Sequence, residues 1–285
     1  MLKKEVSKGM NIVIVGLGII GGSLAKAFTK YTDHRVIGIN RSEATAKRAF
    51  ADGAIHEIGT AVSLSKADIV YMCTYPEHIV SYVKENSGHF KKGCIITDVC
   101  GIKTEICGRL TEICDKNGLQ YVGSHPMAGK EKFSYDAAEA ELFQNASYIV
   151  VPCSADEKSV DTVVTLAKEI GFGIVRISTP EEHDRMIAFT SQVPHVLACA
   201  YVMSPCCENH KGFSAGSYRD VSRVANINEN LWTYLFLSNK EPLSKEISIL
   251  IENLTNIKNA IDENNSEVLK ELLKKSRLIK ESLGE

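Results

Sequence analysis

Hydrophobic and polar positions divide the chain into two stretches of different texture. Up to about residue 178, short apolar runs alternate with stretches whose apolar residues recur every three or four positions. The stretches with helical spacing include 42–52 and 155–170. This alternation is typical of a parallel β-sheet flanked by helices. The apolar runs predict strands at 11–15, 35–39, 68–73, 94–99, 120–123, 147–151 and 173–178.

The second stretch opens with a helix start signal. Thr179 is placed to cap a helix, Pro180 fits the first helical position, and Glu182 completes a capping box. From there onward almost no strand signal is found, and apolar residues keep helical spacing to the end of the chain. We therefore expect two domains, 1–178 and 179–285, of which the second is all-α.

Glycines follow the first predicted strand in a GxGxxG pattern, just before a helical stretch. Gly16 permits a tight turn, Gly18 lets the backbone approach a pyrophosphate, and Gly21 lets helix and strand pack closely. The pattern predicts an α/β fold whose N-terminal domain is a Rossmann-type dinucleotide-binding domain. The residues expected to contact the cofactor are Gly16, Leu17, Gly18, Ile19, Ile20, Gly21 and, at the end of the strand 68–73, Cys73.

The second predicted strand ends without the acidic residue that usually binds the adenosine ribose of NAD. Asn40, Arg41 and Ser42 occupy this position instead. A carboxylate would repel a 2′-phosphate, whereas these side chains accept one. We therefore predict that NAD and NADP are both accepted, with a slight preference for NADP. The alternative is that Arg41 is an ordinary solvated residue at a helix start.

Composition narrows the class of protein. The net charge of −2 offers no basic field for nucleic acid, and no apolar run approaches the roughly 18 residues of a membrane helix. The N-terminus lacks a signal-peptide pattern. The nine cysteines are scattered without a CxxC pair, so we interpret them as free thiols in a reducing cytoplasm and expect no metal site.

A histidine follows the strand predicted at 120–123, in the segment SHPMAGKEK. Ligands of such sheets bind outside the carboxyl ends of the strands. Hydride transfer from a carbinol carbon needs a base for the hydroxyl proton, and an imidazole suits this role at neutral pH. His125 is therefore the candidate catalytic base, with a purely structural histidine as the alternative.

Five segments together resemble the prephenate dehydrogenase family of tyrosine biosynthesis, and the resemblance covers nearly the whole chain. It implies NAD(P)-dependent oxidative decarboxylation of prephenate to 4-hydroxyphenylpyruvate. It also implies a homodimer held together by the helical domain. The segments are GLGIIGGSLA (16–25), TDVCGIK (97–103), HPMAGKE (125–131), EEHDRMIAFTSQVPH (181–195) and GSYRDVSRVANINENLW (216–232).

The resemblance implies roles for individual residues. His125 would take the proton of the ring hydroxyl, and His195 matches the second functional histidine of the family. Because Pro194 precedes His195, a helix kink is expected that would turn this histidine toward the cleft. Arg223 matches the substrate-binding arginine, and Lys130 would add positive charge. Structural alternatives stay open: a core histidine at 195, a surface pair of Arg223 with Asp220, and a solvated loop around Lys130.

One departure from the family pattern concerns a serine that helps to orient the catalytic histidine and the substrate. In the segment DVCGIK, Gly101 stands at this position and offers no hydroxyl. Water or the neighbouring Ser124 would have to replace it, so Ser124 is included among the substrate-binding candidates.

Other functions remain open at this point. Arogenate dehydrogenase differs only in the substrate side chain, which the sequence does not resolve. A non-catalytic NAD(P)-binding redox sensor is a second alternative, although it would need none of His125, His195 and Arg223. A third is another β-hydroxyacid dehydrogenase with a helical second domain, although such enzymes usually rely on a lysine in that domain.

Overall fold

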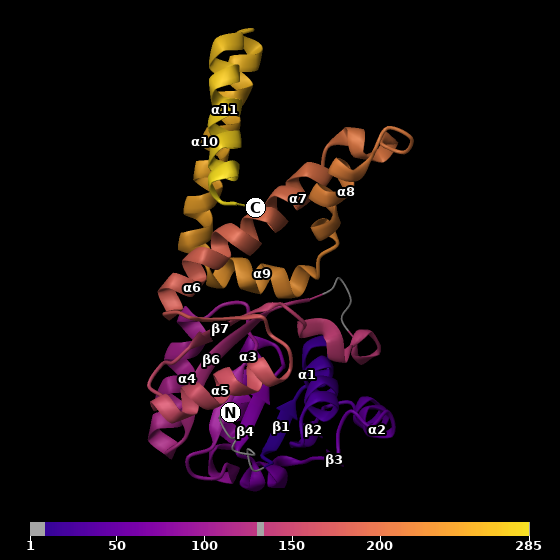
Figure 1. Cartoon of the computed structure of the whole chain (residues 1–285), viewed down its shortest axis with the longest axis vertical. Helices are drawn as coiled ribbons and strands as arrows, with labels where there is room; N and C mark the ends of the chain where they lie inside the picture. The colour runs from indigo at the N-terminus through magenta and orange to yellow at the C-terminus, as the bar shows by residue number, and fades with distance from the viewer. Residues whose placement is uncertain (1–8, 130–133, 285) are drawn as a thin grey trace, which may run out of the picture.

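One twisted β-sheet with helices on both faces forms the N-terminal half of the protein (Figure 1). The computed structural model describes residues 9–129 and 134–284. The strands follow the order β3-β2-β1-β4-β5-β6-β7-β8 across the sheet. They are β1 (Asn11–Val15), β2 (Arg35–Ile39), β3 (Glu57–Ile58), β4 (Ile69–Met72), β5 (Ile95–Asp98), β6 (Gln120–Met127), β7 (Ser147–Val151) and β8 (Ile174–Ile177).

The sheet is parallel from β1 to β6, but β7 pairs antiparallel with β6. The predicted parallel architecture is therefore found from β1 to β6, whereas β7 and β8, which are parallel to each other, run in the opposite direction. The described part of the β6–β7 connection contains only the short 3₁₀ turns η3 (Tyr135–Ala137) and η4 (Ala140–Phe143). A parallel return usually runs through an α-helix, which the described part of this connection does not contain.

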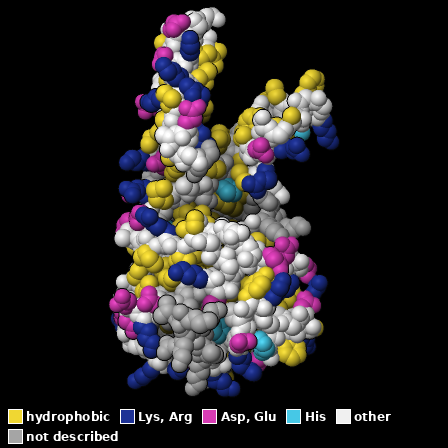
Figure 2. All heavy atoms as spheres, in the orientation of Figure 1, with side chains coloured by type: hydrophobic (Ala, Val, Ile, Leu, Met, Phe, Trp, Pro, Cys, Tyr) yellow, Lys and Arg dark blue, Asp and Glu magenta, His cyan; other side chains and the backbone are white. Residues whose placement is uncertain are grey.

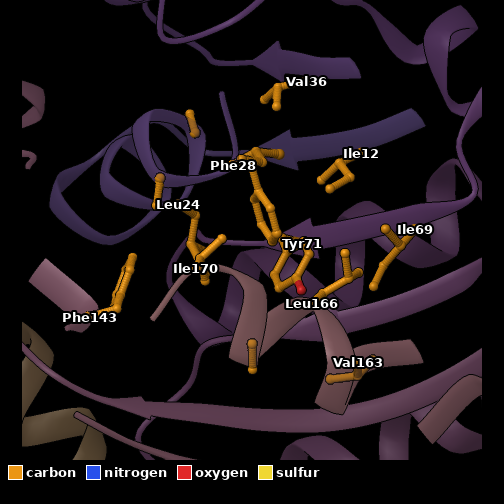
Figure 3. Close-up of a cluster of buried hydrophobic side chains, with 14 of the residues drawn as sticks. Ile12, Leu24, Phe28, Val36, Ile69, Tyr71, Phe143, Val163, Leu166 and Ile170 are labelled. Atoms are coloured by element: carbon orange, nitrogen blue, oxygen red, sulfur yellow. The ribbon is translucent and has the colours of Figure 1, made fainter. Parts of the chain in front are cut away.

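Both faces of the sheet are buried, which explains why its strands read as continuous apolar runs. In β1, Ile12 and Ile14 belong to the apolar cluster on one face, whereas Val13 and Val15 belong to the cluster on the other. Figure 3 shows the first cluster, in which the rings of Phe28 and Tyr71 lie 5.4 Å apart. Helices α1 (Ile19–Tyr31) and α5 (Glu157–Glu169) cover this face, and α3 (Pro76–Glu85) and α4 (Thr104–Asn117) cover the other.

The described chain after β8 consists of helices and the connections between them, and two helical arms project from the sheet domain (Figure 1). The prediction of an α/β nucleotide-binding domain followed by an all-helical region is confirmed. No helix within the described ranges combines the length and apolar character that a membrane crossing requires. The remaining helices are α2 (Glu43–Ala51), α6 (Pro180–Ile187), α7 (Val193–Val202), α8 (Gly216–Ser222), α9 (Glu229–Ser238), α10 (Lys240–Asp262) and α11 (Ser266–Ser282), with shorter turns at Ala61–Lys66, Ser87–His89, Pro205–Asn209 and Arg223–Ala225.

A π-helical turn, η5 (Ala188–Gln192), joins α6 to α7 directly before Pro194. Proline has no backbone N–H and cannot continue the regular α-helical ladder, so a local change of helix type here is physically reasonable. Such π turns occur often at functional sites. This π turn ends at Gln192, two residues before the proline at which a kink is predicted.

Candidate active site

The glycine loop between β1 and α1 has a backbone that only glycine tolerates. Gly16 has φ +96°, and a Cβ there would lie 2.6 Å from the carbonyl oxygen of Cys73. A Cβ on Gly21 would lie 1.9 Å from the carbonyl oxygen of Gly16. These contacts are far inside van der Waals distance. The loop is therefore built for close approach of backbone to backbone at the start of α1.

The N-terminus of α1 is suited to an anion. Gly18 occupies the cap position without a side-chain cap, and the first turn carries no acidic residue. The backbone N–H groups of this turn and the helix dipole favour a phosphate. Beside the loop, the Thr74 hydroxyl is buried without a hydrogen-bond partner among the described residues. These features fit the pyrophosphate of a dinucleotide.

Three of the predicted cofactor contacts have side chains that serve the fold. Leu17 is 1% exposed and belongs to the core. The Ile20 side chain packs against the same core. Cys73 lies under the loop, and burial raises the pKa of its thiol far above the usual value. Any contact of these residues with a phosphate would therefore come through the backbone.

The side chains of Asn40 and Ser42 have structural partners. Asn40 accepts a hydrogen bond from the Leu17 N–H at 2.9 Å and donates to the Ser42 carbonyl at 3.1 Å. The Ser42 hydroxyl caps α2 by accepting from the Thr45 N–H. Arg41 is exposed and makes no hydrogen bond or ion pair with another residue that the structure describes. Arg41 is the positively charged side chain of the three, and the exposed Ser42 hydroxyl, which only accepts in its bonds with Thr45, keeps its O–H to donate.

His125 lies inside β6, which continues to Met127, so the prediction that the strand ends before this histidine is wrong. The parallel pairing of β6 with β5 nevertheless stops at Val122. Beyond this point β6 pairs only with β7, where His125 faces Ile149. Pro126 is tolerated because one side of β6 has no neighbouring strand here. His125 is thus located beyond the carboxyl end of the parallel sheet.

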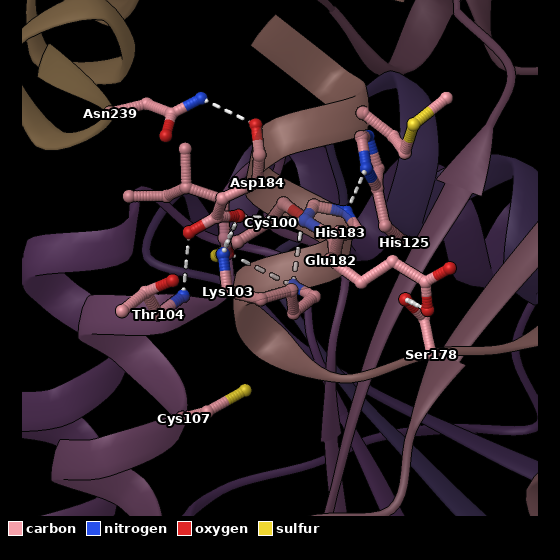
Figure 4. Close-up of polar contacts among 12 residues, drawn as sticks. Cys100, Lys103, Thr104, Cys107, His125, Ser178, Glu182, His183, Asp184 and Asn239 are labelled. Atoms are coloured by element: carbon pink, nitrogen blue, oxygen red, sulfur yellow. Dashed lines mark hydrogen bonds and ion pairs between the residues drawn. The ribbon is translucent and has the colours of Figure 1, made fainter. Parts of the chain in front are cut away.

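His125 is the partly buried first member of a hydrogen-bonded chain whose other members are buried (Figure 4). Its Nδ1 lies 2.9 Å from Nε2 of His183, and Nδ1 of His183 lies 2.7 Å from Oδ1 of Asp184. The carboxylate only accepts, so Nδ1 of His183 donates to it. With both imidazoles neutral, Nε2 of His183 then accepts from Nδ1 of His125. Nε2 of His125 is left unprotonated, as a base requires.

The electrostatics of this chain keep both imidazoles neutral. Burial lowers the pKa of His125 well below its usual value, and His183 and Lys103 act in the same direction. Burial likewise lowers the pKa of His183, although Asp184 partly opposes the shift. Burial raises the pKa of Asp184, but hydrogen bonds from His183 and Thr104 outweigh this and the pKa is lowered overall.

Asp184 also joins the helical region to the sheet domain. Its two carboxylate oxygens accept from the backbone N–H groups of Lys103 and Thr104, each at 2.7 Å. These groups belong to the first turn of α4, whose own cap residue supplies no side-chain bond. Asp184 thus caps α4 from α6, and the helix dipole favours its negative charge.

A buried ion pair supports the turn between β5 and α4. Lys103 and Asp98 are both 0% exposed, and their Nζ and Oδ2 atoms lie 2.6 Å apart. Asp98 also accepts from the Tyr121 hydroxyl at 2.8 Å and from the Cys100 N–H at 2.9 Å. Removing one partner of such a pair typically costs about 3–5 kcal/mol. The pair therefore fixes the turn that carries Gly101 beside His125.

Ser124 does not fit the expected role in substrate binding. Successive residues of a strand point to opposite faces, so its side chain points away from that of His125. Ser124 is 0% exposed, and its hydroxyl contacts the Asp98 carbonyl at 2.5 Å and the Tyr148 hydroxyl at 2.6 Å. The hydroxyl therefore stabilises the sheet and is not available to a substrate.

Helix α9 packs against the surroundings of both candidate histidines. His195 of α7 stacks on Trp232 of α9 at 3.7 Å, and its Nδ1 donates to the Ser191 carbonyl at 2.8 Å. A Cβ added to Gly101 would lie 3.5 Å from the Leu235 side chain and 3.9 Å from Cε1 of His125. Trp232 and Leu235 are three residues apart and share a face of α9. His195 therefore lies against this helix, and His125 is separated from it by Gly101.

Arg223 lies in the turn η7 (Arg223–Ala225), which packs against α7. Its side chain is exposed. Lys130, the other predicted cation, lies outside the described residues.

Comparison with known proteins identifies the family. The model of the prephenate dehydrogenase nucleotide-binding domain matches residues 24–176, and the model of the prephenate dehydrogenase dimerization domain matches residues 179–275. The chain belongs to the prephenate dehydrogenase family. It is 31% identical to prephenate dehydrogenase from Bacillus subtilis over 269 residues, covering 90% of this chain and 72% of the relative. It is 30% identical to cyclohexadienyl dehydrogenase from Zymomonas mobilis over 279 residues, covering 94% of each.

Solved structures of the family include proteins with different substrates in their names. Aquifex aeolicus prephenate dehydrogenase, in complex with hydroxyphenyl propionate and NAD+, has a TM-score of 0.86 at 25% identity. That match covers 98% of this chain and all of the other. Synechocystis arogenate dehydrogenase has a TM-score of 0.82 at 26% identity and covers 96% of this chain and 100% of its own. The prediction of family membership is confirmed, while the similarity leaves the substrate open.

His183 and Asp184 are not among the predicted site residues, although both lie in the segment 181–195 that resembles the family. A usable signal is their position in α6: they share the buried face with Ile187, at spacings where an amphipathic helix normally carries apolar residues. A histidine next to an aspartate at such positions indicates a buried polar contact, because buried polar groups are almost always hydrogen-bonded.

Replacing Gly101 with Ser is expected to leave folding unchanged and to keep at least wild-type turnover. Gly101 does not have positive φ, and a Cβ would make only ordinary van der Waals contacts. The new hydroxyl would lie next to His125, at the position where the family resemblance implies a serine. Thermal melting and steady-state kinetics of Gly101→Ser test this, and an unfolded variant would contradict the placement.

Proposed function

We propose that this protein catalyses the NAD(P)-dependent oxidative decarboxylation of prephenate to 4-hydroxyphenylpyruvate. The observation that carries the proposal is the chain from Asp184 through His183 to His125, which leaves Nε2 of His125 unprotonated. His125 lies in the segment of β6 that extends past the carboxyl end of the parallel sheet. That is the edge at which sheets of this class bind their ligands.

His125 acts first in the proposed reaction by taking the proton of the ring hydroxyl. As the imidazole becomes charged, it donates from Nδ1 to His183, and Asp184 stabilises the positive charge through His183. A bound nicotinamide supplies the chemistry of accepting the hydride from the carbinol carbon. The oxidised ring then loses its carboxylate as CO2 and becomes aromatic, so the reaction is effectively irreversible.

The two carboxylates of prephenate require positive groups at the site. We assign one of them to Arg223, whose guanidinium can hold a carboxylate bidentately. Support comes from the packing of η7 against α7, the helix that carries His195. His195 is assigned to substrate binding next to Trp232. Lys130 is kept as a further candidate.

Arogenate oxidation is the second candidate function, favoured by the similarity to Synechocystis arogenate dehydrogenase. The hydroxyl chemistry at His125 is the same for both substrates, and only the side chain differs. A non-catalytic sensor is less favoured, because it gives no reason for a hydrogen-bonded chain that ends in an unprotonated imidazole.

The assay that tests the proposal follows absorbance at 340 nm with prephenate or arogenate, each with NAD and with NADP. We expect turnover with prephenate. Turnover with arogenate alone would select the second candidate, and no turnover with either substrate would overturn both.

Replacing Asn40 with Asp and Arg41 with Ala together is expected to shift cofactor preference from NADP toward NAD. The exposed Arg41 guanidinium can pair with a 2′-phosphate, although an exposed ion pair contributes only about 0–1 kcal/mol. A slight wild-type preference for NADP is therefore expected. The measurement is kcat/KM for both cofactors on the wild type and the double variant. A wild type that uses NAD alone would show that Arg41 has no such role.

We further propose that the helical domain forms a homodimer. The match to a dimerization domain supports this, and Figure 2 shows apolar side chains along both helical arms. Phe213 is 93% exposed, Met203 74% and Ile251 57%. Large apolar side chains exposed on the surface are typical of an interface when they gather in a patch. Light scattering at micromolar concentration should give the mass of two chains, and a stable monomer would contradict it.

A further inference from the structure

Two buried amide side chains lie where the helices of the active site meet. Gln192 is 1% exposed and Asn239 is 3% exposed. Gln192 ends the π turn η5, and Asn239 stands between α9 and α10. Burying an amide is unfavourable unless its groups are hydrogen-bonded. The partners of these two side chains therefore indicate what the amides do.

The hydrogen bonds form a chain with a defined direction. Nδ2 of Asn239 donates to the Asp184 carbonyl at 2.8 Å and to Oε1 of Gln192 at 2.7 Å. Because a backbone carbonyl can only accept, the amide orientation of Asn239 is fixed. Gln192 accepts from Asn239, and its own Nε2 donates to the Leu235 carbonyl at 3.0 Å.

The Leu235 end of the chain stabilises the C-terminus of α9. This helix ends at Ser238 because Asn239 has φ −116° and ψ 31°, outside the helical region. The last carbonyls of a helix lack partners within the helix. Gln192 supplies one to Leu235, whose side chain lies next to Gly101 and within the surroundings of His125. Gln192 thus fixes the position of the C-terminal end of α9 relative to His125.

The other end of the chain is the backbone of Asp184. The carboxylate of this residue receives His183 and caps α4. Asn239 therefore connects the segment that orients His125 to the corner between α9 and α10 (Figure 4). Trp232 of the same α9 stacks on His195. The hydrogen-bonded chain through the two amides therefore influences the positions of both His125 and His195.

We propose that Gln192 and Asn239 are positioning residues of the active site. They act through the carbonyls of Leu235 and Asp184, and they set the placement of α9 relative to His125 and His195. The proposal rests on the proposed function, because positioning is meaningful only where His125 is the base.

The test uses the double variant Gln192→Met with Asn239→Leu in the full chain. The hydrogen bond between the two amides is lost together with both of its partners, which can be nearly neutral for stability, whereas the Leu235 carbonyl is left without its donor, which lowers stability. We expect cooperative unfolding and unchanged NADPH affinity. We expect kcat at saturating substrate and cofactor to fall at least about 10-fold, because a misplacement of about 1 Å can cost about 100-fold. Asn117→Leu is the matched control, since Asn117 donates to a helix carbonyl on the exposed surface of α4.

A spectroscopic readout separates positioning from general loss of activity. Trp232 is the single tryptophan of the chain and stacks on His195. Its emission therefore reports how α9 packs against α7, and His195→Gln should change it. In the double variant we expect a changed emission. The Asn117→Leu control should behave as the wild type does.

The outcomes are decisive in each case. Wild-type kcat together with wild-type Trp232 emission in the double variant would overturn the proposal. If the double variant fails to fold, Gln192→Met alone is tested in the same two assays, because it breaks both bonds of Gln192 and leaves Asn239 on Asp184. If the wild type oxidises neither prephenate nor arogenate, the proposed function fails. The fluorescence comparison then still decides whether the amides place α9.

Discussion

Replacing His125 with Asn is expected to lower turnover by about 10²–10⁴-fold, the usual contribution of a positioned acid–base group. The asparagine amide can still donate to Nε2 of His183, so the hydrogen-bonded chain retains a partner. An amide cannot accept a proton at neutral pH, so the base alone is removed. Steady-state kinetics and substrate binding should show a loss in kcat with binding retained.

A matched control for this substitution is His89→Asn. His89 is an exposed histidine in the turn Ser87–His89, and its replacement should leave turnover unchanged. If His125→Asn kept near wild-type turnover, another group would have to be the base. The chain from Asp184 to His125 would then be a structural contact between the two domains.

Replacing Arg223 with Ala is expected to weaken substrate binding by roughly 10- to 200-fold. A hydrogen bond to a charged group typically contributes about 1.5–3 kcal/mol, and about 1.4 kcal/mol corresponds to a factor of ten. Cofactor affinity should change little, because the glycine loop lies in the other domain. The comparison is KM for prephenate against the Kd for NADPH.

Arg277→Ala serves as the control for the arginine substitution, because Arg277 pairs with Glu281 on the exposed surface of α11. Equal losses of substrate and cofactor binding in Arg223→Ala would indicate a folding defect. Unchanged substrate binding would show that another cation holds the carboxylate, and Lys130 would be the next candidate.

Local patterns were sufficient to predict the parallel part of the sheet. The run at 11–15 is apolar at every position but its first because both faces of β1 are buried, and the glycine spacing after it reflects one tight turn. Such features depend on neighbours in the sequence. The C-terminal half of β6 was missed because its only strand partner is antiparallel β7, which follows after a long connection.

The hydrogen-bonded partners of the site could not be predicted in the same way. His125 and His183 are 58 positions apart, and Lys103 and Asp184 are 81 positions apart. Only the packing of α6 against α4 brings them together. Asn40 gives a second example: its position predicts a cofactor contact, but not that its side chain also holds the glycine loop through the Leu17 N–H. The direction of a side chain is set by tertiary contacts that spacing does not encode.

The pH dependence of kcat/KM tests most directly whether His125 is held as a neutral base. Burial lowers the pKa of His125 below the usual 6.5, so the protonated, inactive form accumulates only at lower pH. With substrate loss corrected in enzyme-free controls, kcat/KM should stay level from pH 8 down to about pH 6.5 and fall only below it. This acid limb should be absent in His125→Asn. A wild-type profile that is already half-maximal at or above pH 6.5 would contradict the account.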